Sequence, residues 1–208
     1  AREIAAFSGV KLVNIMKKKL FLVFCLLFTV HSLHAGAGTT SAQFLKLSSG
    51  GRASALGNAF TAVTNDAFSV FYNPAGIAFS EKKHVSLMYS TYLEEISYQN
   101  VAFSMPLGEK LGIGLGVTML SYGTIKGYDD QMQPTKDVPA SDMAVNISGG
   151  DKVTETIGAG FTLKYISETL DDKTGSTPSA DLLFIFKKDK DYAGLSAQNL
   201  FGSLKFIS

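Results

Sequence analysis

Two residue types, tryptophan and cysteine, are almost absent from the sequence. It contains no tryptophan and only one cysteine, Cys25, in 208 residues. Cys25 lies in a segment that we expect to be removed, so disulfide bonds cannot stabilise the processed chain. A lipid anchor on Cys25 is also disfavoured, because a small residue should precede such a cysteine and Phe24 stands there.

Material for catalysis is equally scarce. His84 is the only one of the three histidines that follows residue 35, which leaves almost nothing for a histidine-based metal site or a catalytic triad. The segment Gly112–Gly116 superficially resembles a nucleotide-binding loop, but the full G-x-G-x-x-G pattern is absent. We therefore predict no enzymatic activity, no cofactor and no metal site.

The charge of the chain excludes another class of partner. The formal net charge is +1, and Lys17–Lys19 at the N-terminus contribute to it, so the remainder is slightly acidic and a nucleic-acid partner is not expected. The pairs Asp129-Asp130 and Asp171-Asp172 could bind calcium weakly, but solvated loop charge explains them better.

The N-terminal region carries an export signal. Met16 and three lysines precede an apolar run from Leu20 to Val30, and Ala35-Gly36-Ala37 offers a cleavage site. This run is too short for a spanning helix, which needs roughly 20 residues. We predict a cleaved signal peptide at 16–35, preceded by upstream, non-native translation at 1–15; a retained N-terminal anchor is the alternative. No later apolar run is long enough for a transmembrane helix.

Strict alternation dominates the rest of the chain. In Leu111–Ser121, large apolar residues alternate with glycine and threonine, which is the period-two pattern of a strand. The same pattern predicts further strands at the following segments: His84–Tyr92, Gln99–Met105, Asp142–Ser148, Glu155–Ser167, Ala180–Phe186 and, most weakly, Tyr192–Asn199.

The composition of the two faces distinguishes a membrane barrel from a soluble sandwich. A sandwich strand usually averages about 5–6 residues and exposes a charged face, whereas several of these strands run to about 10 residues. Their second face carries Gly, Ser, Thr and Asn. Apolar residues toward lipid and small polar residues toward a lumen are typical of a transmembrane antiparallel outer-membrane β-barrel.

The connections between strands predict the orientation of the barrel. Long segments, Gly123–Ser141 and Glu168–Pro178, alternate with short ones near Leu107, Gly149 and Lys187. Because outer-membrane barrels have longer loops outside, we expect the long pair at the cell exterior and the short turns in the periplasm. Seven strands plus the start of another at Leu204–Ile207 predict a C-terminally truncated fragment, with the partial barrel at 81–208.

The segment before the first strand carries a family resemblance. The strings that carry it are Ala42-Gln43-Phe44-Leu45-Lys46, Gly51-Arg52-Ala53, Leu56-Gly57-Asn58-Ala59-Phe60, Asn65-Asp66-Ala67, Asn73-Pro74-Ala75-Gly76 and, from later strands, Ala140-Ser141-Asp142-Met143-Ala144-Val145, Lys164-Tyr165-Ile166 and Gly194-Leu195-Ser196-Ala197-Gln198-Asn199-Leu200. These strings are similar to those of outer-membrane proteins of the PorV/PorQ family and, more distantly, of FadL-like channels.

This resemblance implies that residues 36–80 fold into the barrel as a hatch, a plug inside the lumen. The residues allow it: Pro74 holds Asn73 in extended or turn geometry, Asn73 can bond its local backbone, and Gly76 permits a left-handed turn. We regard Asn73, Pro74, Ala75 and Gly76 as a structural motif without chemistry. An ordinary turn before the first strand is the alternative. In the lumen, Lys164 and Asp181 are polar candidates for a salt bridge or a selectivity role.

The resemblance also implies the function, with two branches. The first is a component of type IX protein secretion that contacts secretion-system proteins or exported cargo. The second is FadL-like uptake of long-chain fatty acids or other hydrophobic small molecules. A purely structural surface protein is a third reading. In each case the protein contacts outer-membrane lipid and resides in the outer membrane of a Gram-negative cell.

Overall fold

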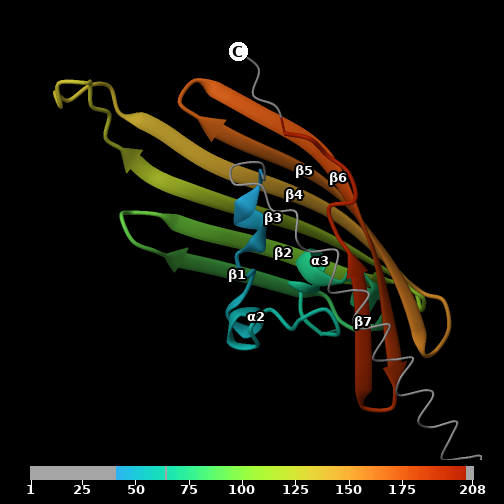
Figure 1. Ribbon diagram of the computed structural model, residues 1–208. Coiled ribbons are helices and arrows are strands. Elements are labelled where there is room, and N and C mark those ends of the chain that lie inside the picture. Colours follow the sequence, from blue (N-terminus) through green and yellow to red (C-terminus); the bar gives the residue numbers. More distant parts are fainter. Residues whose placement is uncertain (1–40, 64, 205–208) are drawn as a thin grey trace, which may run out of the picture. The chain divides into compact units, whose positions relative to one another are not determined.

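The computed structural model describes residues 41–63 and 65–204. The predicted upstream segment, signal peptide and cleavage site lie outside the described residues, as do residues 36–40 of the predicted hatch. The described chain begins with four short helices and continues as strands from His84 onward (Figure 1). Among these residues, none of the helices has the length and apolar character needed to cross a membrane.

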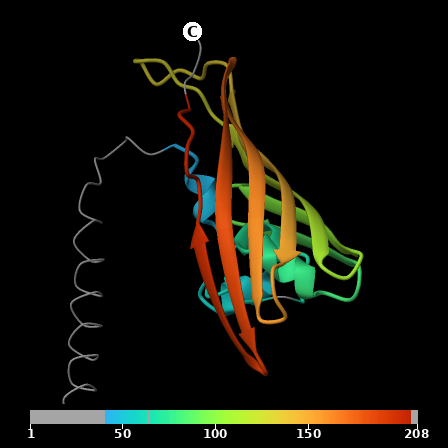
Figure 2. The same ribbon diagram turned by 90° about the vertical axis from the view of Figure 1, so that its right-hand side faces the viewer.

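All strands belong to one antiparallel sheet in which sequence neighbours pair in order. This sheet confirms the predicted all-β fold, and it curves around the helices as a half-barrel (Figure 2). We call it the wall. Its strands are β1 (His84–Thr91), β2 (Ser97–Leu107), β3 (Leu111–Ile125), β4 (Val138–Lys152), β5 (Ile157–Leu170), β6 (Lys173–Lys188) and β7 (Asp191–Ala197).

Alternation along the strands translates directly into two faces of the wall. In β3, Leu111, Ile113 and Leu115 are about half exposed, whereas the glycines between them are buried. The same alternation runs through β4 and β5, where most buried positions are small or polar: Asp142, Ala144, Asn146, Ser148 and Gly150 in β4, and Gly158, Thr162, Lys164 and the apolar Ile166 in β5. The apolar face therefore points outward and the small polar face points toward the helices, as the pattern predicts.

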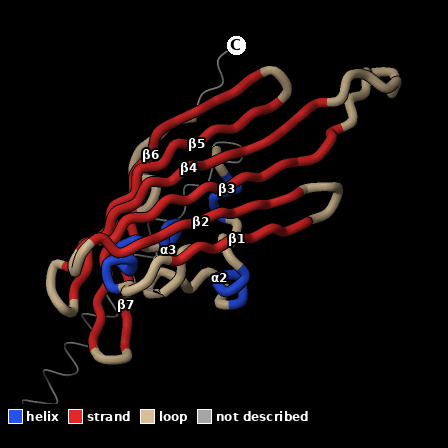
Figure 3. The backbone as a smooth tube through the Cα atoms, turned by 180° about the vertical axis from the view of Figure 1, so that it is seen from behind, coloured by secondary structure: helices blue, strands red, loops and turns tan. Residues whose placement is uncertain are grey.

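The helices lie on the concave side of the wall only, as the view from behind makes clear (Figure 3). They are η2 (Gln43–Lys46), α2 (Gly51–Ala55), α3 (Ser69–Tyr72) and η3 (Pro74–Phe79). We keep the name hatch segment for residues 41–80. Its apolar side chains fill two clusters with wall residues, one around Phe44 and Tyr98 and one around Phe60 and Phe68.

The prediction of a long polar loop at Glu168–Pro178 is wrong. β5 extends to Leu170 and β6 begins at Lys173, so only Asp171 and Asp172 connect them. Threonine suits a strand as well as a loop, and the hydroxyls of Thr169 and Thr174 bond across the pair at 3.1 Å.

Other predicted boundaries were too narrow for the same reason. β3 runs to Ile125 and β4 starts at Val138, so the loop between them is shorter than Gly123–Ser141. β4 also continues through Gly149 to Lys152, which moves the next turn to residues 153–156. The predicted strand start at Leu204–Ile207 lies outside the described residues, apart from Leu204 itself.

Candidate functional site

The hatch segment is anchored to the wall through Asn73, which is fully buried. Its side-chain amide donates to the carbonyl oxygens of Thr61 at 2.7 Å and Phe184 at 3.0 Å. Its carbonyl oxygen Oδ1 accepts from the backbone N–H of Ala75 at 3.2 Å. One side chain thus caps η3, ties two parts of the hatch segment together and bonds to β6 of the wall.

Asn73 has an extended backbone and Pro74 begins η3, which agrees with the restriction that proline places on the preceding residue. The left-handed turn predicted at Gly76 is wrong, because Gly76 lies buried inside the 3-10 helix η3. The motif therefore starts a short helix. Proline suits the first helical position, where its missing N–H is not needed.

The 3-10 helix η3 packs against glycines of the wall. A Cβ added at Gly150 would meet the carbonyl oxygen of Pro74, and one added at Gly160 would meet the backbone N of Ala75. At Gly112 an added Cβ would lie 2.7 Å from the backbone carbonyl carbon of Ile77. The backbone of η3 thus contacts the backbone of the wall directly, and only glycine leaves room for it. Gly114 and Gly116 of the same strand leave room for side chains of the hatch segment instead, those of Val70, Phe71 and Ile77.

A second glycine contact holds the middle of the hatch segment. An added Cβ at Gly194 of β7 would meet the carbonyl oxygen of Thr61, the same residue that accepts from Asn73. Before α3, the side chain of Arg52 donates to Asn65 Oδ1 at 3.2 Å, and Asp66 Oδ1 accepts from the N–H of Phe68 at 2.9 Å. These bonds fix the turns that lead into α3.

Lys164 and Asp181, the two luminal candidates, form a buried ion pair. Lys164 Nζ lies 2.8 Å from Asp181 Oδ2, and their side chains are 5% and 2% exposed. Asn199 completes the group: its Oδ1 accepts from Lys164 at 3.2 Å and its N–H donates to Asp181 Oδ1 at 2.8 Å. A buried pair needs such additional bonds to offset its desolvation. The network joins β5, β6 and the segment after β7.

Other polar residues extend this group across the concave face. Thr118 donates to Asn100 Oδ1 at 2.9 Å, and Ser148 bonds to Thr162 at 2.9 Å. Asn100 Nδ2 and Asn146 Oδ1 are buried and have no hydrogen-bond partner among the described residues. An ordered water molecule commonly supplies the hydrogen bond that such a buried polar atom lacks. Of these residues, Ser148 also reaches the hatch segment, where its Oγ donates to the carbonyl oxygen of Val70 at 3.5 Å.

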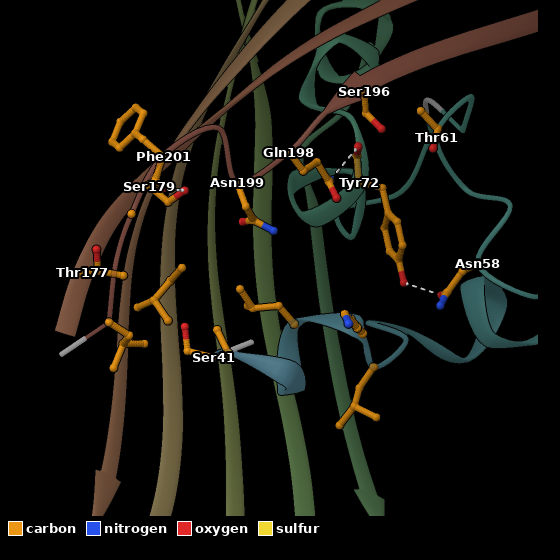
Figure 4. Close-up of a pocket in the computed structure, with 17 residues that line it drawn as sticks. Ser41, Asn58, Thr61, Tyr72, Thr177, Ser179, Ser196, Gln198, Asn199 and Phe201 are labelled. Carbon is orange, nitrogen blue, oxygen red and sulfur yellow. Dashed lines mark hydrogen bonds between the residues drawn. The ribbon is translucent and has the colours of Figure 1, made fainter. Parts of the chain in front are cut away.

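A cavity of about 480 Å³ lies between the hatch segment and the last strands. Tyr72, Asn58 and Thr61 stand on one side, and Thr177 and Ser179 on the other (Figure 4). Tyr72 donates to Asn58 Oδ1 at 3.1 Å, and burial raises the pKa of the Tyr72 phenol. Among the residues that the structure describes, Lys46 is the only charged one that lines the cavity.

At the end of the wall with the short turns, Phe79 closes the hatch segment. The ammonium groups of Lys152 and Lys187 lie 5.6 Å and 5.5 Å from the centre of its ring, a cation–π arrangement. His84 is at the same end, where its Nε2 bonds to Ser80 Oγ at 2.9 Å. This is a rim position and gives His84 a structural partner.

At the opposite end, the β3–β4 loop is ordered by its own bonds. Asp129 Oδ1 accepts from the N–H groups of Gln131 and Gln133, and Tyr128 pairs with Pro134. Asp137 raises the pKa of Lys126 through an ion pair of 2.9 Å. In the part of the chain that is described, no group of three or more potential metal ligands occurs.

The sequence predicted a structural role for Asn73 and a luminal position for Lys164 and Asp181. It did not predict that Asn199 bonds to this ion pair, or that η3 packs against the glycines of the wall. Asn199 follows a weak strand pattern, and nothing local marks its partner on another strand. The glycines did carry a signal. They recur at every second position of β3 opposite large apolar residues, which indicates close approach of another backbone.

The comparison with known families identifies the chain. The model of a family described as type IX secretion system protein PorV matches residues 32–182. A comparison with curated proteins gave no match. The matched range includes η3, the glycines that receive it and the Lys164–Asp181 pair. The chain belongs to the PorV family and is an outer-membrane protein associated with type IX secretion.

Proposed function

We propose that this chain contacts exported proteins at the end of the wall formed by the β1–β2, β3–β4 and β5–β6 connections. We call this the loop end and place it at the cell exterior. The role is binding, with no catalytic step. The hatch segment keeps the lumen filled while a partner is held outside. The proposal goes beyond family membership, which implies secretion and no particular contact.

The single observation that carries the proposal is the exposure of apolar side chains at the loop end. Leu93 is 85% exposed and Met132 is 76% exposed, and Tyr128 stands in the same loop as Met132. Apolar groups that are gathered in one exposed patch outside the membrane region mark protein contacts, and we take Tyr128 and Met132 of the β3–β4 loop as part of such a patch. Because this loop is held by its own bonds, Tyr128 and Met132 are presented without a large ordering cost on binding.

Loop length supports the orientation. The β3–β4 connection covers residues 126–137, whereas the connections at the other end cover only 108–110, 153–156 and 189–190. Outer-membrane barrels have longer loops outside and shorter turns in the periplasm. The β5–β6 turn is short and does not contribute to this argument.

The test compares two exposed apolar residues at opposite ends of the wall. Met132→Asp changes the loop end, and Val153→Asp changes the turn at residues 153–156, where Val153 is 57% exposed. Each variant is expressed from the complete gene in a strain that lacks the native protein. The secretome, surface display of exported proteins and uptake of labelled oleate are then measured.

We expect Met132→Asp to reduce display of exported proteins and Val153→Asp to leave it unchanged, with normal oleate uptake in both. Equal secretomes for both variants and the wild type would contradict the proposal. Lost uptake with a normal secretome would instead support the FadL-like reading. Assembly is checked by heat-dependent migration on gels, so that misfolding is not mistaken for lost binding.

A further inference from the structure

Another cavity lies at the end of the wall opposite the loop end, which we call the turn end. Its volume is about 550 Å³, within the range of about 300–1,000 Å³ that is usual for ligand sites. Residues 78–81 form one side, and the β2–β3 connection, the β4–β5 connection and the end of β6 form the others. At this end Lys187 of β6 pairs with Tyr192 of β7, and Leu111 of β3 pairs with both β2 and β4. The cavity therefore lies among strands that are paired with their neighbours.

Three lysines of the wall meet at this cavity: Lys110, Lys152 and Lys187. Buried, luminal positions are even-numbered in β3 and β4 and odd-numbered in β6, so all three lysines have the register of the luminal face. The backbone N–H of Lys152 donates to the carbonyl oxygen of Lys110 at 2.8 Å, which makes these two lysines neighbours across the β3–β4 pair. Like charges in such positions repel each other, and a nearby anion relieves this repulsion.

An aromatic ring, and not a set of carboxylates, lies beside the two inner lysines. The ammonium nitrogens of Lys152 and Lys187 lie 5.6 Å and 5.5 Å from the centre of the Phe79 ring, and that of Lys187 lies 5.9 Å from the centre of the Tyr192 ring. Both lysines are half-buried. Among the described residues, the three lysines form one ion pair, between Lys152 and Glu155 at 3.8 Å, and the Glu155 side chain is 89% exposed. Lys187 thus keeps its capacity to bind an anion.

Three glutamates that line the cavity restrict the kind of anion that it accepts. Glu81, Glu109 and Glu155 are exposed, so their carboxylates lie at the mouth, whereas Lys152 and Lys187 lie deeper. An anion that enters passes these carboxylates, and the repulsion grows in proportion to its charge. A singly charged carboxylate is therefore favoured over a phosphate group, which carries about −1.5 to −2 at neutral pH.

The remaining lining fits the residue that carries such a carboxylate. Ala78, Phe79 and Pro106 give the cavity an apolar wall, against which the methylene groups of an acidic side chain can pack. The cavity is also much larger than one carboxylate group, so it admits neighbouring backbone as well. The loop-length argument places the turn end in the periplasm, where a protein segment is the source of such a group.

We propose that the turn-end cavity binds the side-chain carboxylate of a glutamate or aspartate in a segment of a periplasmic protein. The carboxylate accepts charge-assisted hydrogen bonds from Lys152 and Lys187, while its methylene groups contact Phe79. This site is at the opposite end of the wall from the contact proposed for exported proteins. The inference goes beyond that proposed function and does not depend on it.

The test uses the full-length protein in detergent and two capped peptides, GSESG and GSQSG, which differ in one carboxylate. Saturation-transfer NMR detects weak binding of each peptide, and a titration gives its dissociation constant. We expect GSESG to bind and GSQSG to bind about tenfold more weakly, because the neutral amide cannot form the charge-assisted hydrogen bonds. High salt should weaken the binding of GSESG.

Neighbouring lysines of β6 supply a matched pair of variants. Lys187→Gln removes one of the two inner ammonium groups and should weaken the binding of GSESG about tenfold. Lys188→Gln removes the same charge from the next residue, which is exposed and does not line the cavity, and should bind GSESG like the wild type. If Lys187→Gln does not assemble, Lys110→Gln takes its place, because Lys110 is exposed where it lines the cavity, and should also weaken binding.

Three results would overturn the inference. The first is equal binding of the two peptides, or no binding of either. The second is equal weakening by Lys187→Gln and Lys188→Gln, which would mean that general surface charge attracts the peptide. The third is displacement of GSESG by an equal concentration of inorganic phosphate, which would mean that the cavity accepts any anion. None of these results affects the secretome comparison of Met132→Asp with Val153→Asp, so the two proposals fail separately.

Discussion

The two faces of the wall are built from the same strands but present side chains of opposite size. The outward side of β3 presents Leu111, Ile113 and Leu115, each 42–53% exposed. The inward side presents glycines, and the hatch segment supplies the missing volume with Val70 and Ile77. Large side chains face lipid, and small ones admit a second layer of backbone.

This difference shows where specificity resides. The outward face needs only apolar character and tolerates exchanges among large residues. The inward face depends on the absence of side chains at Gly150 and Gly160 and on the pairing of Lys164 with Asp181. Substitutions should therefore cost most where they leave a luminal group unpaired, and less where they alter the lipid face.

The largest expected effect comes from the luminal ion pair. Asp181→Leu leaves the ammonium of Lys164 buried without a counter-charge and should lower the free energy of unfolding by about 3–5 kcal/mol. Lys164→Met in the same chain should restore most of this loss, because the double variant buries no charge. Urea unfolding in detergent micelles measures both. A double variant as unstable as Asp181→Leu would contradict the assignment.

On the lipid face, Leu115→Arg should cost about 2–4 kcal/mol if Leu115 lies near the bilayer midplane. Gly114→Arg should act through a different mechanism, by displacing Val70 and Ile77 of the hatch segment. Refolding into lipid vesicles distinguishes the two, since only the first depends on the bilayer. Equal tolerance of arginine on both faces of β3 would favour a soluble sandwich.

Adjacent glycines of β4 offer a sharper comparison. Gly150→Ala places a methyl group against the carbonyl of Pro74 and should destabilise the protein by about 1–3 kcal/mol, as overpacking does. Gly149→Ala is the matched control, because nothing lies within 4 Å of an added Cβ there. Thermal unfolding compares them, and similar midpoints would mean that η3 does not rest on β4.

The smallest effect is expected at the loop end. Lys136→Met removes the ion pair between Lys136 and Asp171. The side chains of these two residues are 81% and 44% exposed, respectively. Exposed pairs contribute about 0–1 kcal/mol and are screened by salt. Unfolding at low and high salt should show a small difference between variant and wild type only at low salt. A larger loss would indicate that the two hairpin tips depend on each other.

Much of the wall could be predicted from sequence because alternation directly reports the two environments of a strand. Prediction from the sequence failed where the local residue pattern indicates one structure and strand pairing produces another. The Thr- and Ser-rich stretch around Glu168–Pro178 has the composition of a loop, yet pairing with β5 makes it a strand. Asn199 leaves the sheet because of Asp181, a contact between positions that no local rule connects.

The packing of η3 on the glycine face is the central structural claim, and a cross-link tests it most directly. An added Cβ at Gly160 would lie 3.1 Å from Ala75 Cβ and would also meet the backbone nitrogen of Ala75. A small outward shift of η3 would therefore bring two cysteines at these positions to the Cβ separation of about 3.5–4.5 Å found in disulfides. The pair Ala75→Cys and Gly160→Cys, in the full-length protein with Cys25 replaced by serine, should form a disulfide in outer membranes. The pair Ala75→Cys and Gly149→Cys should not. Absence of the first cross-link while both single variants assemble would contradict the account.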